Sequence, residues 1–350
     1  MTSRRDALCV LGSLGAMACG ARAGAPAARS TADAPFRLQP LVDLVPAAGL
    51  LWLVDLRPVE LIGDRAFAQA LSTVIPDTSL DAFAERHGGV DLRGATELVV
   101  AGFPDTVLLL ARLPFEPGRV ERAFAARALF VEGRAFDRGV TRVWGTLGTV
   151  RTQLALFGHD TLAIEQGRFG PLRTAIYFAL GKLSRAPSAL RASPLNDLAA
   201  RLGEAPARAF APGPFEGEWG AAGGGLLRAS TAVGAAVRMR TDGLDRDEGN
   251  RQGDAAGSHP AAPDLLAAQL ILTGAWGRDA GAAAKRLEAS FQVLADDALG
   301  RLTGLDRLPR QPVARVDPAA LDFEVDLDPR VVARGLHAAT EASIAELLAF

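Results

Sequence analysis

The sequence is poor in cysteine, and both of its cysteines, Cys9 and Cys19, lie among the first twenty residues. The rest of the chain has none, which excludes a disulfide scaffold, a cysteine metal site and a cysteine nucleophile there. Lysine is also scarce: Lys182 and Lys285 are the only two. The many arginines never form a basic block and are spread among 40 acidic residues. Because nucleic-acid binding needs a clustered basic surface, no nucleic-acid partner is expected.

Long apolar runs are missing as well, since none reaches the ~18 residues that a membrane-spanning helix needs. Hydrophobic residues nevertheless make up 49% and charged residues 22% of the 350 positions, which is typical of a folded globular protein. The length is enough for two ordinary domains or one large one. The excess of arginine over lysine, with abundant alanine, glycine and proline, indicates a GC-rich genome.

Motifs for chemistry are absent, so we assign no catalytic, cofactor-binding or metal-ligating residue. The serines lack the G-x-S-x-G elbow of a hydrolase. Gly223–Gly225 lacks the residues that follow a phosphate-binding loop and indicates a linker or bulge. The four histidines are not spaced as a helical metal pair, and we expect them to be solvated at the surface: His87, His159, His259 and His337.

The N-terminus has the three parts of a secretory signal peptide. Arg4 and Arg5 precede an apolar segment over 7–18, and small residues lead into Cys19. We therefore expect residues 1–18 to be a signal peptide. A plain signal peptide cut elsewhere, or a cytoplasmic protein with an apolar start, remain the alternatives.

Two resemblances refine this expectation. Ala16-Met17-Ala18-Cys19 resembles the lipobox of bacterial lipoproteins, although such boxes usually have leucine where Ala16 stands. The resemblance implies that Cys19 is lipidated and anchors the protein to the periplasmic face of a membrane. Ser3 to Leu8, with Arg4 and Arg5, resembles a twin-arginine export signal. Gly20 after the cysteine, in place of aspartate, slightly favours the outer membrane.

Beyond a small, polar, proline-containing tether (19–37), strand and helix patterns alternate. We expect an α+β fold of two similar modules, 38–185 and 186–350, each a mainly antiparallel sheet with helices packed on one face. The polar, glycine-rich segment 243–263 has no apolar periodicity and is expected to be a flexible loop. Because strand-like segments flank it, we expect these to be neighbouring antiparallel strands.

Several elements are expected from local pattern. Helices are expected over 59–76, 116–130 and 277–302, and a further helix is expected to have Ser193 as its N-cap and Pro194 at its first position. Segments 224–231 and 232–242 are expected to be strands. The tryptophans Trp52 and Trp144 are expected in the core, and Trp219 at the surface.

Alternating acids mark the strand near the C-terminus, where Asp322, Glu324, Asp326 and Asp328 share one face. The pattern is compatible with a cation site or a surface for a basic partner. It is also what the solvated side of an antiparallel sheet would show, which we favour.

The stretches 87–102 and 107–124 resemble a set of exported proteins and lipoproteins without assigned function from GC-rich bacteria. They combine a helix, a Gly-Asp-Leu turn, a strand hairpin and an amphipathic helix. The expected function is that of a cell-envelope lipoprotein with a non-enzymatic binding or structural role, held to the membrane by its lipid, with another envelope protein as a candidate partner. The alternatives are a carrier that holds an apolar ligand between sheet and helices, and an envelope hydrolase.

Overall fold

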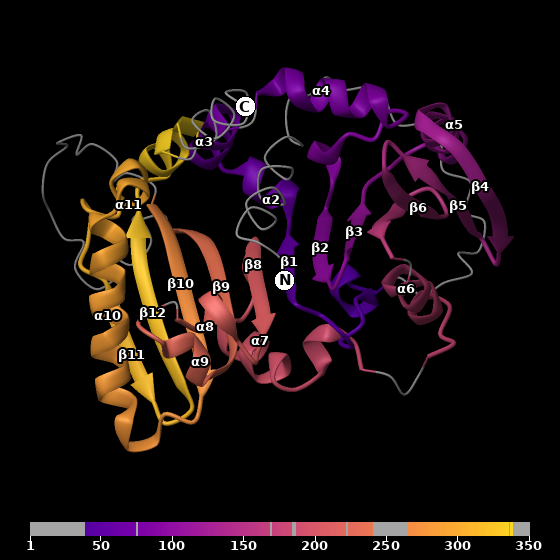
Figure 1. Ribbon diagram of the computed structural model, residues 1–350. Helices are drawn as coiled ribbons and strands as arrows, with labels where there is room; N and C mark the ends of the chain where they lie inside the picture. Colours follow the sequence, from indigo (N-terminus) through magenta and orange to yellow (C-terminus); the bar gives the residue numbers. More distant parts are fainter. Residues whose placement is uncertain are drawn as a thin grey trace, which may run out of the picture.

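A computed structural model describes residues 39–338 except 75, 169, 184–186, 222, 241–264 and 336. The fold is α+β, built on a single antiparallel sheet of twelve strands in the order β11-β12-β10-β9-β8-β1-β2-β3-β7-β6-β5-β4. The strands follow one another across the molecule from β11 to β4 (Figure 1).

The first seven strands are β1 (Trp52–Leu56), β2 (Glu97–Phe103), β3 (Thr106–Arg112), β4 (Ala128–Asp137), β5 (Val140–Leu147), β6 (Val150–Phe157) and β7 (Thr161–Gly167). The others are β8 (Ala207–Pro212), β9 (Ser230–Arg240), β10 (Leu265–Gly274), β11 (Val313–Asp317) and β12 (Ala320–Leu327). As expected, β9 and β10 pair antiparallel on either side of the glycine-rich segment, which itself lies outside the described residues.

The α-helices are α2 (Pro58–Gly63), α3 (Arg65–Val74), α4 (Asp77–Arg86), α5 (Pro117–Arg127), α6 (Pro171–Ala179), α7 (Leu195–Leu202), α8 (Gly217–Ala221), α9 (Leu226–Ala229), α10 (Ala280–Asp296) and α11 (Ala298–Thr303). Short 3-10 helices are η1 (Leu41–Leu44), η2 (Leu92–Gly94), η3 (Ala189–Arg191) and η4 (Gly277–Asp279). Residues 329–335 are also helical.

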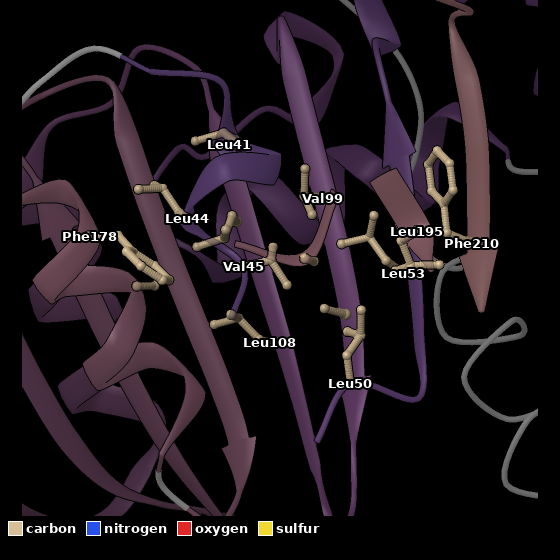
Figure 2. Close-up of a cluster of buried hydrophobic side chains, with 14 of the residues drawn as sticks. Leu41, Leu44, Val45, Leu50, Leu53, Val99, Leu108, Phe178, Leu195 and Phe210 are labelled. Carbon is tan, nitrogen blue, oxygen red and sulfur yellow. The ribbon is translucent and has the colours of Figure 1, made fainter. Parts of the chain in front are cut away.

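Both faces of the sheet are covered, so the expectation of helices on one face was wrong. Face A carries Leu53, Val99 and Leu108, and it packs against η1, η3, α6 and α7 (Figure 2). Face B packs against α4 and α5 over one half of the sheet and against α9 and α10 over the other. The cause is visible in β3, where Leu108, Leu109 and Leu110 are consecutive. A strand that is apolar on both faces needs cover on both.

One continuous sheet joins the two halves of the chain, because β1 pairs antiparallel with β8. The sequence pattern did not predict β8, which is short, rich in alanine and contains the charged residue Arg208. Inside the sheet, Arg208 donates two hydrogen bonds to one carboxylate oxygen of Asp55, at 3.1 and 2.6 Å. Both side chains are 8% exposed. This ion pair therefore crosses the junction between the halves within the protein interior.

Other differences are local. The helix expected over 59–76 is interrupted at Asp64, whose carboxylate accepts a hydrogen bond from the Phe67 backbone N–H that begins α3. The helix expected over 116–130 ends at Arg127, because the next ten residues form the edge strand β4. In segment 224–231, which was expected to be a strand, residues 226–229 form helix α9 and only Ser230 and Thr231 belong to a strand, β9.

Two further helices differ from expectation. Ser193 is not the cap of α7, since Pro194 occupies that position. The helix expected over 277–302 is divided at Asp297, whose side chain accepts from the Ala298 backbone N–H. In the first half of the chain, α4 and α5 both pack on face B of the sheet.

Candidate functional site

A cavity of about 170 Å³ lies between face B and the helices α4 and α5. Twelve of its sixteen lining residues are apolar, and His87, Arg127, Thr152 and Gln166 are the polar ones. The apolar residues come from α4, α5, the segment that follows α4 and five strands: Phe83, Val90, Leu92, Val100, Val107, Leu109, Val120, Phe124, Leu147, Leu154, Leu162 and Ile164. Arg127 and Gln166 are exposed, so the cavity reaches solvent beside them.

The size of the cavity limits what it can hold. An apolar cavity of ~150 Å³ accommodates one benzene molecule, whereas pockets for whole drug-sized ligands span roughly 300–1,000 Å³. The cavity of about 170 Å³ therefore fits a single ring or the end of an alkyl chain, with the rest of a larger ligand outside.

A glycine sets the spacing of the two helices that roof the cavity. Gly88, just after α4, has φ +72° and lies against the start of α5. A Cβ at this position would stand 2.6 Å from the carbonyl oxygen of Arg119 and 2.8 Å from the backbone nitrogen of Val120. Only glycine combines this backbone conformation with so close an approach. The end of α4 is thereby fixed against α5, on the side where His87 lines the cavity.

His87 corrects the expectation that the histidines are solvated, because its ring is half-buried. It stacks on Phe83 with ring centroids 3.8 Å apart, and its Nδ1 lies 2.8 Å from the Phe83 carbonyl oxygen, to which it donates as the protonated ring nitrogen. Burial, together with the nearby charges of Arg127 and Arg86, lowers the pKa of His87 to about 4. The imidazole is therefore neutral at pH 7 and can line an apolar cavity.

This pKa predicts a pH-dependent stability. Below pH 6.5 the unfolded chain protonates His87 whereas the folded protein does not, so the free energy of unfolding falls between pH 6.5 and about 4. We expect this decline to be shallower in His87→Asn and unchanged in His159→Asn, which alters an exposed histidine. Urea denaturation across this pH range measures it. If the free energy of unfolding fell equally steeply with falling pH in all three proteins, the lowered pKa of His87 would be contradicted.

Arg127 lies at the rim of the cavity. Burial and the neighbouring charge of Arg86 lower the pKa of its guanidinium. Among the residues that the structure describes, neither arginine forms an ion pair, although Arg86 Nε donates to the Ala82 carbonyl oxygen at 3.0 Å. The site thus combines an apolar interior with the positive charge of Arg127 at its rim, and Arg86 adds positive charge nearby.

Glu165 is a second buried titratable group, on face A and away from the cavity. One carboxylate oxygen accepts hydrogen bonds from the backbone N–H groups of Gly170 (3.1 Å) and Leu172 (2.8 Å), at the start of α6. Burial raises the pKa of this carboxyl group. Since helix N-termini leave such N–H groups unpaired, Glu165 serves to hold α6 on the sheet.

The alternating acids of β12 form an internal charge network. Asp326, which we expected to be solvated, is buried and accepts from Arg240 (2.8 Å) and Arg310 (2.9 Å). Arg240 and Arg315 also pair with Glu324. Arginines of the same chain therefore offset the repulsion between the acidic side chains of β12, and we assign these acids a structural role. Asp328, the fourth acid of the pattern, lies just after the end of β12.

The edge strand β4 is a second candidate surface. Its exposed apolar side chains include Leu129 (71% exposed), Phe130 (56%) and Phe136 (69%). Exposed edge strands are sites where other chains can pair. The cavity is the stronger candidate, since its lining specifies the character of a ligand as well as a place for one.

The export and lipidation residues of the sequence analysis, Arg4, Arg5 and Cys19, lie outside the described residues, as does His259. His159 is exposed in the β6–β7 turn, whereas Trp52 and Trp144 are half-buried. The side chain of Trp219 is outside the described part. Within the described ranges, no group of three or more His, Cys, Asp or Glu residues could hold a metal ion.

Sequence reasoning missed the cavity and its arginine. One signal was present: Val120, Phe124 and Arg127 follow at intervals of four and three residues, which places an arginine on the apolar face of α5.

None of the described helices is long and apolar enough to cross a bilayer. Comparisons with protein families, curated proteins and solved structures gave no match to this chain.

Proposed function

We propose that the protein is a non-enzymatic lipoprotein of the bacterial cell envelope whose body binds an apolar group of a ligand. The cavity between face B and the helices α4 and α5 is the observation that carries the binding proposal. The cavity is lined mainly by apolar side chains and opens to solvent beside Arg127 and Gln166, so an apolar group can enter it and displace water from an apolar surface. A ligand that binds there only in the folded state would stabilise the protein.

The membrane location rests on the N-terminal sequence. Cys19 is proposed to receive the lipid, Arg4 and Arg5 to direct export, and the anchored protein to face the periplasm, with the outer membrane slightly favoured. At least two acyl chains are needed for stable anchoring. A body held at a membrane surface would meet amphiphilic molecules, whose alkyl chains suit the cavity.

We propose further that the two halves are similar modules, 38–185 and 186–350. The order β1-β2-β3-β7-β6 in the first half corresponds to β8-β9-β10-β12-β11 in the second, and β1 and β8 pair antiparallel at the junction. On face B of the second half, the buried rings of Trp276 and Phe323 occupy the space beneath α10. The proposed binding role therefore belongs to the first module.

A cavity-filling variant tests the binding proposal. Leu109 lies in the centre of β3 and lines the cavity, so Leu109→Phe places a ring in it. We expect the free energy of unfolding to rise by about 0.5–2 kcal/mol, as filled cavities commonly give. We expect binding of octan-1-ol, measured by isothermal titration calorimetry, to be lost.

The matched control is Leu294→Phe, the same substitution at an exposed position of α10. It should leave both stability and octanol binding as in the wild type. Octanol binding that survives in Leu109→Phe, or that the wild type lacks, would refute the proposal. Stability and binding are expected to move in opposite directions, which loss of folding could not produce.

A further inference from the structure

Arg127 interrupts the apolar stripe of α5. Val120 and Phe124 are buried in the cluster over face B, and Arg127, three residues after Phe124, lines the same cavity. Its guanidinium is exposed at the mouth of the cavity and has no carboxylate partner within the described chain. An exposed positive charge at the mouth of an apolar cavity is placed to meet an anionic head group whose apolar chain enters the cavity.

A second positive charge near Arg127 also favours an anionic ligand. Arg86, in the last turn of α4, is close enough to lower the pKa of Arg127, and both arginines lower the pKa of His87. The neutral His87 adds no charge at pH 7, so Arg127 is the lining residue that brings positive charge to the cavity, and Arg86 adds positive charge from outside the lining. An anion bound at Arg127 would offset the repulsion between the two guanidiniums.

We propose that the cavity takes the chain end of a single-chain alkyl carboxylate, a fatty acid, with its carboxylate on Arg127 and near Arg86. This inference rests on the proposed function, since it requires that the cavity binds a ligand. The planar guanidinium matches a carboxylate with two parallel hydrogen bonds. The apolar lining takes the alkyl chain, and the small volume leaves the head group at the rim, where Arg127 stands.

Four probes with one chain and different head groups test the proposal on the full-length protein: octanoate, octan-1-ol, octyltrimethylammonium and octyl phosphate. We expect wild-type protein to bind octanoate roughly tenfold more tightly than octanol, which is the value of one charge-assisted contact. Octyltrimethylammonium should bind more weakly than octanol. Added salt should weaken octanoate binding and leave octanol binding unchanged, because salt screens exposed charges.

Arg127→Gln should reduce the affinity for octanoate to that for octanol and leave octanol binding intact, which shows that the cavity has kept its shape. Arg122→Gln, on the same helix but outside the cavity lining, should retain the octanoate preference. Equal binding of octanoate and octanol by the wild type, or an equal loss in Arg122→Gln, would overturn the head-group assignment alone. Tighter binding of octyl phosphate than of octanoate would overturn the choice of carboxylate. Failure of every probe would overturn the proposed function itself.

Discussion

Asp55→Ala is expected to lower the free energy of unfolding by about 3–5 kcal/mol, the usual cost of breaking a buried ion pair from one side. The substitution leaves Arg208 charged inside the sheet, with the Gly203 carbonyl oxygen at 2.9 Å as its remaining close acceptor. Glu204, at 3.7 Å and largely exposed, can compensate only in part. Because the pair joins β1 to β8, the loss falls on the contact between the two halves. Chemical denaturation measures it.

A double substitution separates the cost of an orphaned charge from the value of the pair. Asp55→Leu with Arg208→Met removes both charges and retains comparable volume, so it should recover most of the lost stability. The exposed pair Arg201–Asp317 supplies the control, and Arg201→Ala should cost at most about 1 kcal/mol. A double variant as unstable as Asp55→Ala would contradict the account, since packing rather than charge would then explain the loss.

Cys19→Ser is expected to move the protein from the membrane fraction to the soluble fraction. Serine lacks the thiol that receives the lipid, and without acyl chains the proposed membrane attachment is lost. Cell fractionation, with the intact mass of the protein, measures the change. The wild type should carry the mass of its acyl chains and the variant should not.

Cys9→Ser is the matched control, because Cys9 lies within the proposed signal peptide and should be absent from the mature protein. It should behave as the wild type. If Cys19→Ser still sediments with membranes and the wild type shows no acyl mass, the lipoprotein proposal is wrong.

Much of the fold followed from local patterns in the sequence. The hairpin of β2 and β3 and the pairing of β9 with β10 are confirmed. The strands β4 and β8 escaped prediction for different reasons. β4 follows α5 without a break and exposes apolar side chains on an edge, whereas β8 contains a buried arginine whose partner, Asp55, is 153 residues away in sequence. Such a pairing depends on tertiary structure that no local pattern encodes.

The candidate site was predictable only in part. The alternative of an apolar ligand between sheet and helices anticipates the kind of cavity that the structure contains. Its place does not follow from the sequence, because a cavity depends on how α4 and α5 pack over five strands. His87 was expected at the surface because a histidine at a helix end usually contacts water. Its stacking on Phe83, four residues earlier, is a local contact at the end of α4, whereas its nearness to Arg127 depends on how closely α5 approaches at Gly88.

Native mass spectrometry of the wild type and Leu109→Phe, each incubated with octanoate and then freed of excess ligand, tests the central claim that the cavity binds an alkyl carboxylate. We expect the wild type to carry one added octanoate per chain and Leu109→Phe to carry none. Equal amounts of bound octanoate in the two proteins, or none in the wild type, would contradict the account.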